Sequence, residues 1–456
     1  VEVVFTAMVV GANTNVTSYT WDFGDGHTAS GDTAAVVTNL YTTPGLYAVT
    51  LEAVNSASET DAMTKGDFIY LAPSVIYVST NGTHTFPFDT WEKAASDIQA
   101  AIDAARVITD AASDVLIDDG TYLITTQLEV FKGIRISSVN GRDATIIRRG
   151  SGSPRIFWIK DADAVIDGFT LDDGRASNVL LNGGTVINCI IKRGQKVRDA
   201  GGLFMSAGVV SNCLFEANRD TGTSSGNAQG AGAVVMSGGL LTHCQLLNNY
   251  GPNYDSNYGP AAGALRMSGG TAQNLVIIGN YLTSNGKNGA VLMTGSGATL
   301  RNSLIAGNGS GNSYAINIGA GTLESCTVVR NQGSGIYYTG GTLRNVISAY
   351  NEGGDLTGTS TAFSYCCIPG INPEDGNGNN VDGEPRFRNA GSGYGISWTP
   401  GNYEVTFGSP CVNAGLNAVW MEGTTDIAGN PRIFGKRVDM GAYESLSSGG
   451  TILMLR

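Results

Sequence analysis

A group of five basic side chains lies between residues 192 and 219. It contains Lys192, Arg193, Lys196, Arg198 and Arg219. Removing a proton next to a sugar carboxylate needs a base such as lysine or arginine, together with positive charge that neutralises the carboxylate. This group could supply both. An ordinary solvated turn would have the same composition, so both interpretations stay open.

Other residue types that perform catalysis or bind metals are scattered. The histidines His27, His84 and His243 lie in three unrelated parts of the chain. Facing carboxylates of the kind that glycoside hydrolysis uses are not visible. Asp118-Asp119 and Asp172-Asp173 each precede a glycine and could bind calcium. We expect no cofactor, with calcium as the alternative.

Three insertions rich in Gly, Ser, Asn and Tyr could form a further binding surface. They span residues 219–231, 250–262 and 281–288 and leave consecutive repeats at the same corner. Their aromatic rings could stack on sugar rings or on a protein partner. The alternative is that the insertions only cover outward-facing apolar residues. The tyrosines of this predicted patch are Tyr250, Tyr254, Tyr258 and Tyr281.

A repeat over residues 179–351 must position these side chains. A glycine-rich turn, an apolar residue, a polar residue and an asparagine return every 20 to 31 residues. A period of this length with variable insertions is typical of a solenoid. The first asparagine column contains Asn188, Asn212, Asn274, Asn302 and Asn345, with His243 and Ser325 in the remaining repeats.

A second asparagine column follows six residues after the first. Short apolar, strand-like runs separate the two, which predicts a parallel β-helix whose copies of each strand pair along the axis. Because an amide can both donate and accept, we expect each column to form a hydrogen-bonded ladder, and Asn212→Leu to destabilise its coil far more than a surface substitution would. The second column contains Asn218, Asn249, Asn280, Asn308, Asn331 and Asn351.

The seven cysteines fall into two groups. The first group occupies one inward column of the repeat, where cysteine behaves as a small interior hydrophobe. The second group lies outside that column, and one disulfide bond among its members is an open alternative. The inward cysteines are Cys189, Cys213, Cys244 and Cys326, and the others are Cys366, Cys367 and Cys411.

Residues 1–72 read as a separate β-sandwich, because short runs of alternating apolar residues are separated by turns. Trp21-Asp22-Phe23-Gly24-Asp25-Gly26, followed by Tyr41 to Tyr47, resembles the PKD domain. The resemblance implies an immunoglobulin-like sandwich that serves extracellular proteins as a spacer or binding module. Val1 falls where the second strand of that family is expected, so the first strand is expected to be missing.

Residues 73–379 are expected to form the β-helix. An apolar stripe predicts a helix over about residues 90–108 that covers the first coil. The run from Asp97 to Ala105, followed by Asp119-Gly120-Thr121-Tyr122, resembles the opening of right-handed β-helix proteins of the pectate-lyase-like superfamily. The predicted fold is therefore all-β, with an immunoglobulin-like sandwich followed by a right-handed parallel β-helix with an N-terminal capping helix.

Residues 380–456 read as a closing segment and tail. Gly408 to Gly415, Asp426 to Arg432 and Val438 to Glu444 resemble the choice-of-anchor Q segment that follows β-helices in bacterial surface proteins. After a Gly-Gly hinge, the tail is apolar and could add as a strand to the incomplete sandwich of another copy. The residues of this assembly tail are Ile452, Leu453, Met454 and Leu455.

Composition limits the remaining possibilities. The formal net charge of −12 argues against nucleic acid as a partner, and no apolar run is long enough to span a membrane. We expect a secreted or cell-surface bacterial protein that is structural or adhesive and non-catalytic, with itself or an extracellular polysaccharide as partner and possible head-to-tail filaments. The alternative is a polysaccharide lyase or glycoside hydrolase that acts on an acidic glycan.

Overall fold

The computed structural model describes most of the chain in two compact units. One unit contains residues 1–118 and 134–136, and the other contains residues 119–133 and 137–456. The described residues are 1–10, 15–108, 111–196, 199–222, 230–251, 261–281, 289–309, 314–359 and 362–446.

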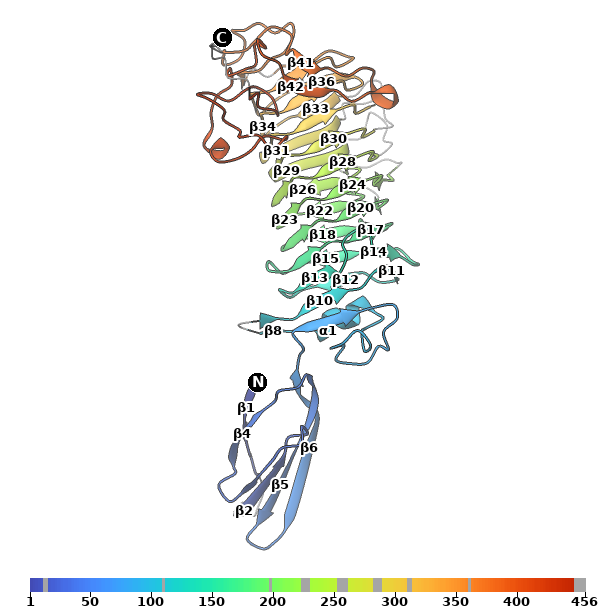
Figure 1. The fold of residues 1–456 in the computed structure, drawn as a ribbon, viewed down its shortest axis with the longest axis vertical. Coiled ribbons are helices and arrows are strands. Elements are labelled where there is room, and N and C mark those ends of the chain that lie inside the picture. Colours follow the sequence, from blue (N-terminus) through green and yellow to red (C-terminus); the bar gives the residue numbers. More distant parts are fainter. Residues whose placement is uncertain are drawn as a thin grey trace, which may run out of the picture. The chain divides into compact units, whose positions relative to one another are not determined.

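The first unit begins with the β-sandwich. One sheet has the order β3-β2-β5-β6, and the other pairs β1 with β4 (Figure 1). Aromatic side chains fill the space between them, and Trp21 and Tyr41 also hydrogen-bond to the Ala34 and Phe23 carbonyls. The strands are β1 (Glu2–Thr6), β2 (Val16–Asp22), β3 (Thr28–Gly31), β4 (Val36–Leu40), β5 (Gly45–Asn55) and β6 (Thr60–Leu71).

The predicted capping helix is much shorter than expected. Helix α1 spans Ile98–Ala104 rather than residues 90–108, and Asp97 caps it by accepting a hydrogen bond from Ala100 N. Residues before it cannot be helical, because Ala95 pairs with β7 (Val75–Val78), whose Tyr77 carbonyl accepts from Ala95 N at 2.8 Å. The same unit contains the hairpin strands β8 (Val107–Ile108) and β9 (Ala111–Ala112), and β10 (Asp114–Ile117).

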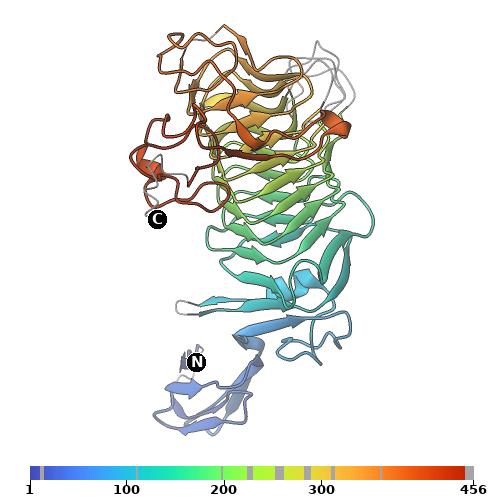
Figure 2. The ribbon, with the colours of Figure 1, turned by 45° about the horizontal axis from the view of Figure 1, so that its top comes forward.

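The second unit is a solenoid of short parallel strands (Figures 1 and 2). Ten of its strands form one continuous sheet, here called the long sheet, with one strand from each coil. Along each strand the central residue points inward and its neighbours point outward. The strands are β11 (Gly120–Ile124), β14 (Thr145–Arg149), β17 (Thr170–Asp172), β20 (Ile190–Lys192), β24 (Leu214–Glu216), β28 (Gln245–Leu247), β30 (Val276–Ile278), β32 (Leu304–Ala306), β35 (Thr327–Val329) and β38 (Ile347–Ala349).

Two further series of strands complete each coil. Both series stack in parallel register, and β29 (Ala262–Gln273) and β31 (Gly289–Arg301) run through both of them. One series contains β12 (Leu128–Val130), β15 (Phe157–Ile159), β18 (Val179–Leu181), β22 (Leu203–Met205), β26 (Val234–Met236), β33 (Tyr314–Ile318), β36 (Ser334–Tyr338) and β39 (Leu356–Gly358). The other contains β16 (Val165–Asp167), β19 (Thr185–Ile187), β23 (Val209–Ser211), β27 (Leu240–Thr242), β34 (Thr322–Glu324), β37 (Thr342–Arg344) and β40 (Phe363–Ser364).

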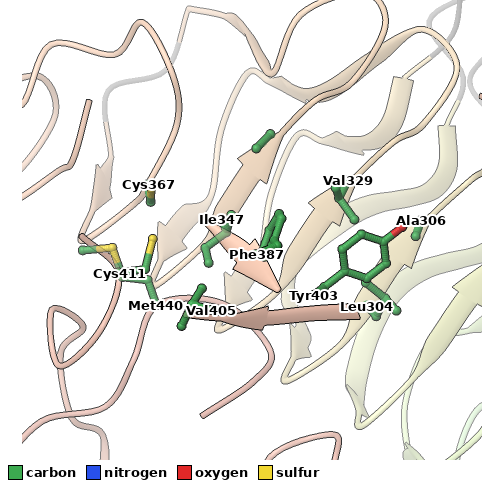
Figure 3. Close-up of a cluster of buried hydrophobic side chains, with 11 residues drawn as sticks. Leu304, Ala306, Val329, Ile347, Cys367, Phe387, Tyr403, Val405, Cys411 and Met440 are labelled. Atoms are coloured by element: carbon green, nitrogen blue, oxygen red, sulfur yellow. The ribbon is translucent and has the colours of Figure 1, made fainter. Parts of the chain in front are cut away.

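The C-terminal segment packs on the outer face of the long sheet in its last coils. Strands β41 (Phe387–Asn389) and β42 (Asn402–Val405) pair with each other. Phe387, Tyr403 and Val405 lie against outward side chains of the sheet such as Val329 and Ile347, as Figure 3 shows. The outer face of these coils is therefore buried and apolar, whereas that of earlier coils carries charged residues.

All seven cysteines are buried free thiols. The Sγ atoms of Cys189, Cys213, Cys244 and Cys326 each donate to a carbonyl oxygen of the solenoid backbone. Burial raises the pKa of the Cys326 thiol to about 12, so this thiol is a weak nucleophile near neutral pH. The disulfide bond that the sequence left open among Cys366, Cys367 and Cys411 is not formed in this structure.

Candidate functional site

The polar cluster of the solenoid lies at the corner where the chain leaves the long sheet. From β17 onward, the residue after each strand of the long sheet turns the chain in a left-handed backbone conformation. Asp173, Arg193 and Ala217 occupy this position in successive coils, with φ of 63°, 52° and 53°. A left-handed conformation costs an ordinary residue about 1 kcal/mol, so the side chains at this corner are held in strained but defined directions.

Asp172 is the centre of the cluster. Its side chain is 0% exposed and accepts from two arginines of neighbouring coils. Arg148 Nε donates to Oδ2 at 2.7 Å, Arg193 Nε donates to Oδ1 at 2.8 Å, and Arg193 Nη2 also donates to Oδ2. The two arginine side chains remain 39% and 52% exposed, so one buried carboxylate fixes two arginines that are still accessible to solvent.

A second carboxylate continues the cluster beside the first. Asp173 accepts from Arg149 Nη2 at 2.6 Å and from Arg175 Nη2 at 3.3 Å. Arg175 in turn donates to the side-chain carbonyl of Gln195 in the next coil. All four carboxylate oxygens of Asp172 and Asp173 therefore bind arginine.

The ion pairs set the protonation of the central groups. Burial raises the pKa of Asp172, but hydrogen bonds from Arg193 and Arg148 outweigh burial and leave that pKa below its usual value. The hydrogen bond to Asp172 raises the pKa of Arg193, although partial burial opposes the shift. Both groups are therefore held in their charged forms.

A cleft of about 450 Å³ opens beside these ion pairs. Arg148 and Arg193 line it together with Asp173, Gln195 and Ala217, and the exposed Arg219 and Tyr250 belong to the following coils. Among the residues that line the cleft, Arg148, Arg193 and Arg219 carry three positive charges against the one negative charge of Asp173. This excess of positive charge stands out on a chain whose formal net charge is −12.

The cleft continues along the corner as a row of stacked side chains. Backbone bridges join Gln195 to Arg219, Arg219 to Tyr250, and Tyr250 to Tyr281. The tyrosines are 41% and 38% exposed, and their ring centroids lie 6.5 Å apart. With rungs about 4.8 Å apart, these four residues form a track roughly 14 Å long, parallel to the solenoid axis.

The structure separates the predicted basic residues. Arg193 lines the cleft. Lys192 and Lys196 do not line it: in the strand register, Lys192 lies beside Asp172 and Glu216, and Lys196 lies beside Asp220. Arg198, Tyr254 and Tyr258 lie outside the described residues, as does the whole assembly tail from Ile452 to Leu455.

Calcium does not fit Asp172-Asp173, because arginine occupies every oxygen of the two carboxylates. Within the ranges that the structure describes, no group of three or more His, Cys, Asp and Glu side chains could hold a metal ion.

The sequence interpretation missed Arg148, Arg149 and Arg175 and the role of Gln195. The signal was present in the strand register. Arg148 is aligned with Asp172, and Asp172 with Lys192, which precedes Arg193. The coils before residue 179 were not part of the recognised repeat, so that alignment was not available from the repeat alone.

The second asparagine column forms a continuous row of buried amides. From Asn218 to Asn331, the Nδ2 of each asparagine donates to the Oδ1 of the next asparagine in the column at 2.9–3.0 Å. The backbone N–H of the donating asparagine also donates to that same Oδ1. Asn178 begins the row and the Asp355 carboxylate ends it. Neither end was expected.

The first asparagine column is a broken row, in which Asn212 is exposed but Asn302 and Asn345 are fully buried. Asn212 donates to Asn188, and Asn302 to Asn274, but Asn345 donates to the Leu416 carbonyl of the C-terminal segment instead. Its members adopt φ between 49° and 56°, which explains why Asn, with its tolerance of left-handed backbone, recurs at this bend.

Two known families match parts of the chain. The PKD domain matches residues 1–68, and the right handed beta helix region matches residues 256–368. The solenoid is a right-handed parallel β-helix. The predicted fold class is therefore confirmed, including the sandwich before the β-helix. No match shows the choice-of-anchor Q segment.

Solved structures are similar to this chain at low sequence identity. Pectate lyase Pel9A is similar over 81% of this chain and 96% of its own, with 14% identity and a TM-score of 0.50. A GH87 alpha-1,3-glucanase catalytic unit from Streptomyces thermodiastaticus strain HF3-3 covers 88% of this chain and 90% of its own, with 13% identity and a TM-score of 0.30. The first likeness shows a shared fold and no more.

Two further comparisons complete the description. The chain matches no curated protein. None of the described helices has both the length and the apolar character needed to cross a membrane.

Proposed function

We propose that this protein is a non-catalytic adhesive or structural β-helix that binds acidic polysaccharide at the arginine–tyrosine cleft. The observation that carries the proposal is the pair of arginines fixed by Asp172 at the edge of a cleft that also contains Arg219 and Tyr250. A linear glycan with carboxylate groups would meet positive charge and aromatic surface along one track.

The chemistry of the side chains supports this ligand class. Arginine presents a planar fork of donors that matches a carboxylate, and such charge-assisted hydrogen bonds are stronger than neutral ones. Because Arg148 and Arg193 are already held by Asp172, binding costs less conformational entropy than it would with free side chains. The exposed faces of Tyr250 and Tyr281 can pack against sugar rings.

The same ion pairs favour binding over catalysis. A general base must be deprotonated near the working pH before it can accept a proton, whereas Asp172 raises the pKa of Arg193 and so keeps it protonated. A general acid must hold a proton, whereas the two arginines keep the pKa of Asp172 low. The proposal involves no metal or other cofactor.

An extracellular location belongs to the proposal. The PKD domain at residues 1–68 supports it, and so does the resemblance of Asp426 to Arg432 and Val438 to Glu444 to the choice-of-anchor Q segment of bacterial surface proteins. We therefore place the protein at the bacterial surface or in the secreted fraction.

The proposal is tested by binding measurements with polygalacturonate, alginate and a neutral glucan as probes. We expect the two acidic polymers to bind in isothermal titration calorimetry and the glucan not to bind. Arg219→Gln should weaken binding about tenfold or more, because a charge-assisted hydrogen bond contributes roughly 1.5–3 kcal/mol. Tyr250→Ala should weaken it less.

Arg388→Gln is the matched control. Arg388 is a surface arginine paired with Glu404 in the C-terminal segment, away from the cleft residues. Equal losses in Arg219→Gln and Arg388→Gln would mean that general charge, and not the cleft, attracts the polymer. Equal binding of the neutral glucan would contradict the proposed ligand class.

The alternative is a polysaccharide lyase or hydrolase acting on an acidic glycan, which the shared β-helix fold permits. Its residues would be Lys192, Arg193, Lys196 and Arg198. A lyase would release unsaturated sugar products that absorb ultraviolet light, and Lys192→Ala would abolish that signal. Turnover of a bound acidic polymer would replace the adhesive proposal with this one.

A further inference from the structure

An open apolar groove runs through the β-sandwich of the first unit. Its volume is about 320 Å³, and it lies between β1 and β6. Phe5, Trp21 and Val49 line it and belong to the buried core of the sandwich, with exposures of 5%, 5% and 4%. The groove therefore gives direct access to the core of the domain.

The rim of the groove is exposed and mostly apolar, although Thr6 and Lys65 also line it. Met8, Met63 and Phe68 line it with exposures of 85%, 65% and 47%. Scattered apolar residues are normal on a surface, but a contiguous exposed group marks an interaction site. These three surround an opening into the core, so a partner that covered them would bury apolar area on both sides.

The backbone beside the groove can accept a further strand. Val1 and Tyr41 exchange both backbone hydrogen bonds, at 2.6 and 2.9 Å. In an antiparallel pair these bonds alternate, so Glu2, Val4 and Thr6 direct their N–H and C=O groups away from β4. Within the described ranges β4 is the strand paired with β1, and β5 is the one paired with β6.

We propose that residues 451–456 of a second copy of this chain occupy the groove as an added β-strand. The segment is Thr-Ile-Leu-Met-Leu-Arg, about as long as the five residues of β1. Strand alternation places Ile452 and Met454 on one face and Leu453 and Leu455 on the other. Either face offers apolar side chains to the groove.

The contact joins different surfaces of the two copies. A head-to-tail contact of this kind leaves a groove free at one end and a strand free at the other, so it generates an open chain of subunits. Main-chain hydrogen bonds would give affinity, and the apolar side chains would give specificity. This inference goes beyond the proposed glycan binding and does not depend on the cleft.

The test uses the full chain, a variant without residues 447–456, and Met63→Asp. Met63 is 65% exposed, so the aspartate places a charge in the groove at little cost to folding. Sedimentation velocity and negative-stain electron microscopy should show concentration-dependent filaments for the full chain. Met63→Asp should be a monomer of about 47.3 kDa and the truncated variant a slightly smaller monomer, each with self-association at least tenfold weaker.

Mixing the two variants gives the sharpest result. The truncated protein keeps a groove and Met63→Asp keeps a strand, so together they should form a dimer and nothing larger. Val36→Asp is the matched control, because Val36 is 58% exposed on β4 and does not line the groove; it should still polymerise. Thermal unfolding of each variant verifies that it is folded.

Three outcomes would overturn the proposal. The full chain could be monomeric at every concentration, in which case no second copy fills the groove. Filaments could persist in the truncated protein, in which case another segment is the occupant. The mixed variants could fail to form a dimer, in which case the strand and the groove do not bind each other.

Discussion

At the scale of single residues, one carboxylate organises the candidate site. Asp172 is fully buried and binds Arg148 and Arg193 from the coils on either side. A buried carboxylate is stable only when it is paired and hydrogen-bonded, and here the partners are the groups that face the cleft. The residue thus acts as a positioning residue for the two arginines.

Asp172→Asn tests positioning against charge. The substitution raises the local positive charge by one but releases the arginines. If fixed geometry matters, acidic polysaccharide should bind several-fold more weakly; if charge alone matters, it should bind more tightly. Calorimetric titration decides, with Glu352→Gln as a control that changes the net charge equally at an exposed site.

At the scale of elements, the two asparagine columns have different roles. Asn280 in the second column is 1% exposed and donates to Leu246 O, Ile278 O and Asn308 Oδ1. Asn212 in the first column is exposed and donates to Asn188. The second column therefore fixes the register of the coils, whereas the first mainly satisfies a left-handed bend.

Asn280→Leu should cost far more than Asn212→Leu. Removing the Asn280 amide leaves several buried donors and acceptors without partners, at about 1–3 kcal/mol each, so we expect a loss of roughly 3 kcal/mol or more. Asn212→Leu should lose about 1 kcal/mol, mainly through backbone strain. Thermal unfolding followed by circular dichroism measures both, and equal losses would contradict the distinction between the columns.

At the scale of the whole molecule, the C-terminal segment returns to cover coils that precede it by a hundred residues. Asn302 donates to Thr425 O, Trp420 Nε1 donates to Glu324, and Ala442 N donates to Thr327. Inside the segment, Arg432 is 0% exposed and lies 3.6 Å from Glu444. This closing segment buries the apolar outer face of the last coils (Figure 3).

Glu444 should make this closing segment pH-dependent. Burial raises its pKa from 4.5 to about 8, with Asp439 adding to the shift and Arg432 opposing it. The folded state then holds a proton that the unfolded state releases, so the free energy of unfolding should fall as pH rises from about 5 to 8. Denaturant unfolding measured at several pH values across this range should show that the free energy of unfolding depends less steeply on pH in Glu444→Gln. An unchanged slope would rule out Glu444 as the titrating group.

By itself, the sequence determined the architecture. A repeat every 20 to 31 residues dictates stacked coils, because each coil can bury its apolar side chains only against its copies. The Trp-Asp-Phe-Gly-Asp-Gly motif likewise marked the sandwich. The helix before the β-helix was overestimated, because its apolar stripe did not reveal that Ala95 pairs with β7.

Only the tertiary structure decided the site. Arg148 and Arg193 are far apart in the sequence and both reach Asp172, because stacking places each of their coils about 4.8 Å from the coil of Asp172. Arg193 looked like one member of a basic run, yet it lines the cleft, whereas its neighbours Lys192 and Lys196 do not. Which side chains of a solenoid converge depends on register and on the direction of each corner, and neither is written in local composition.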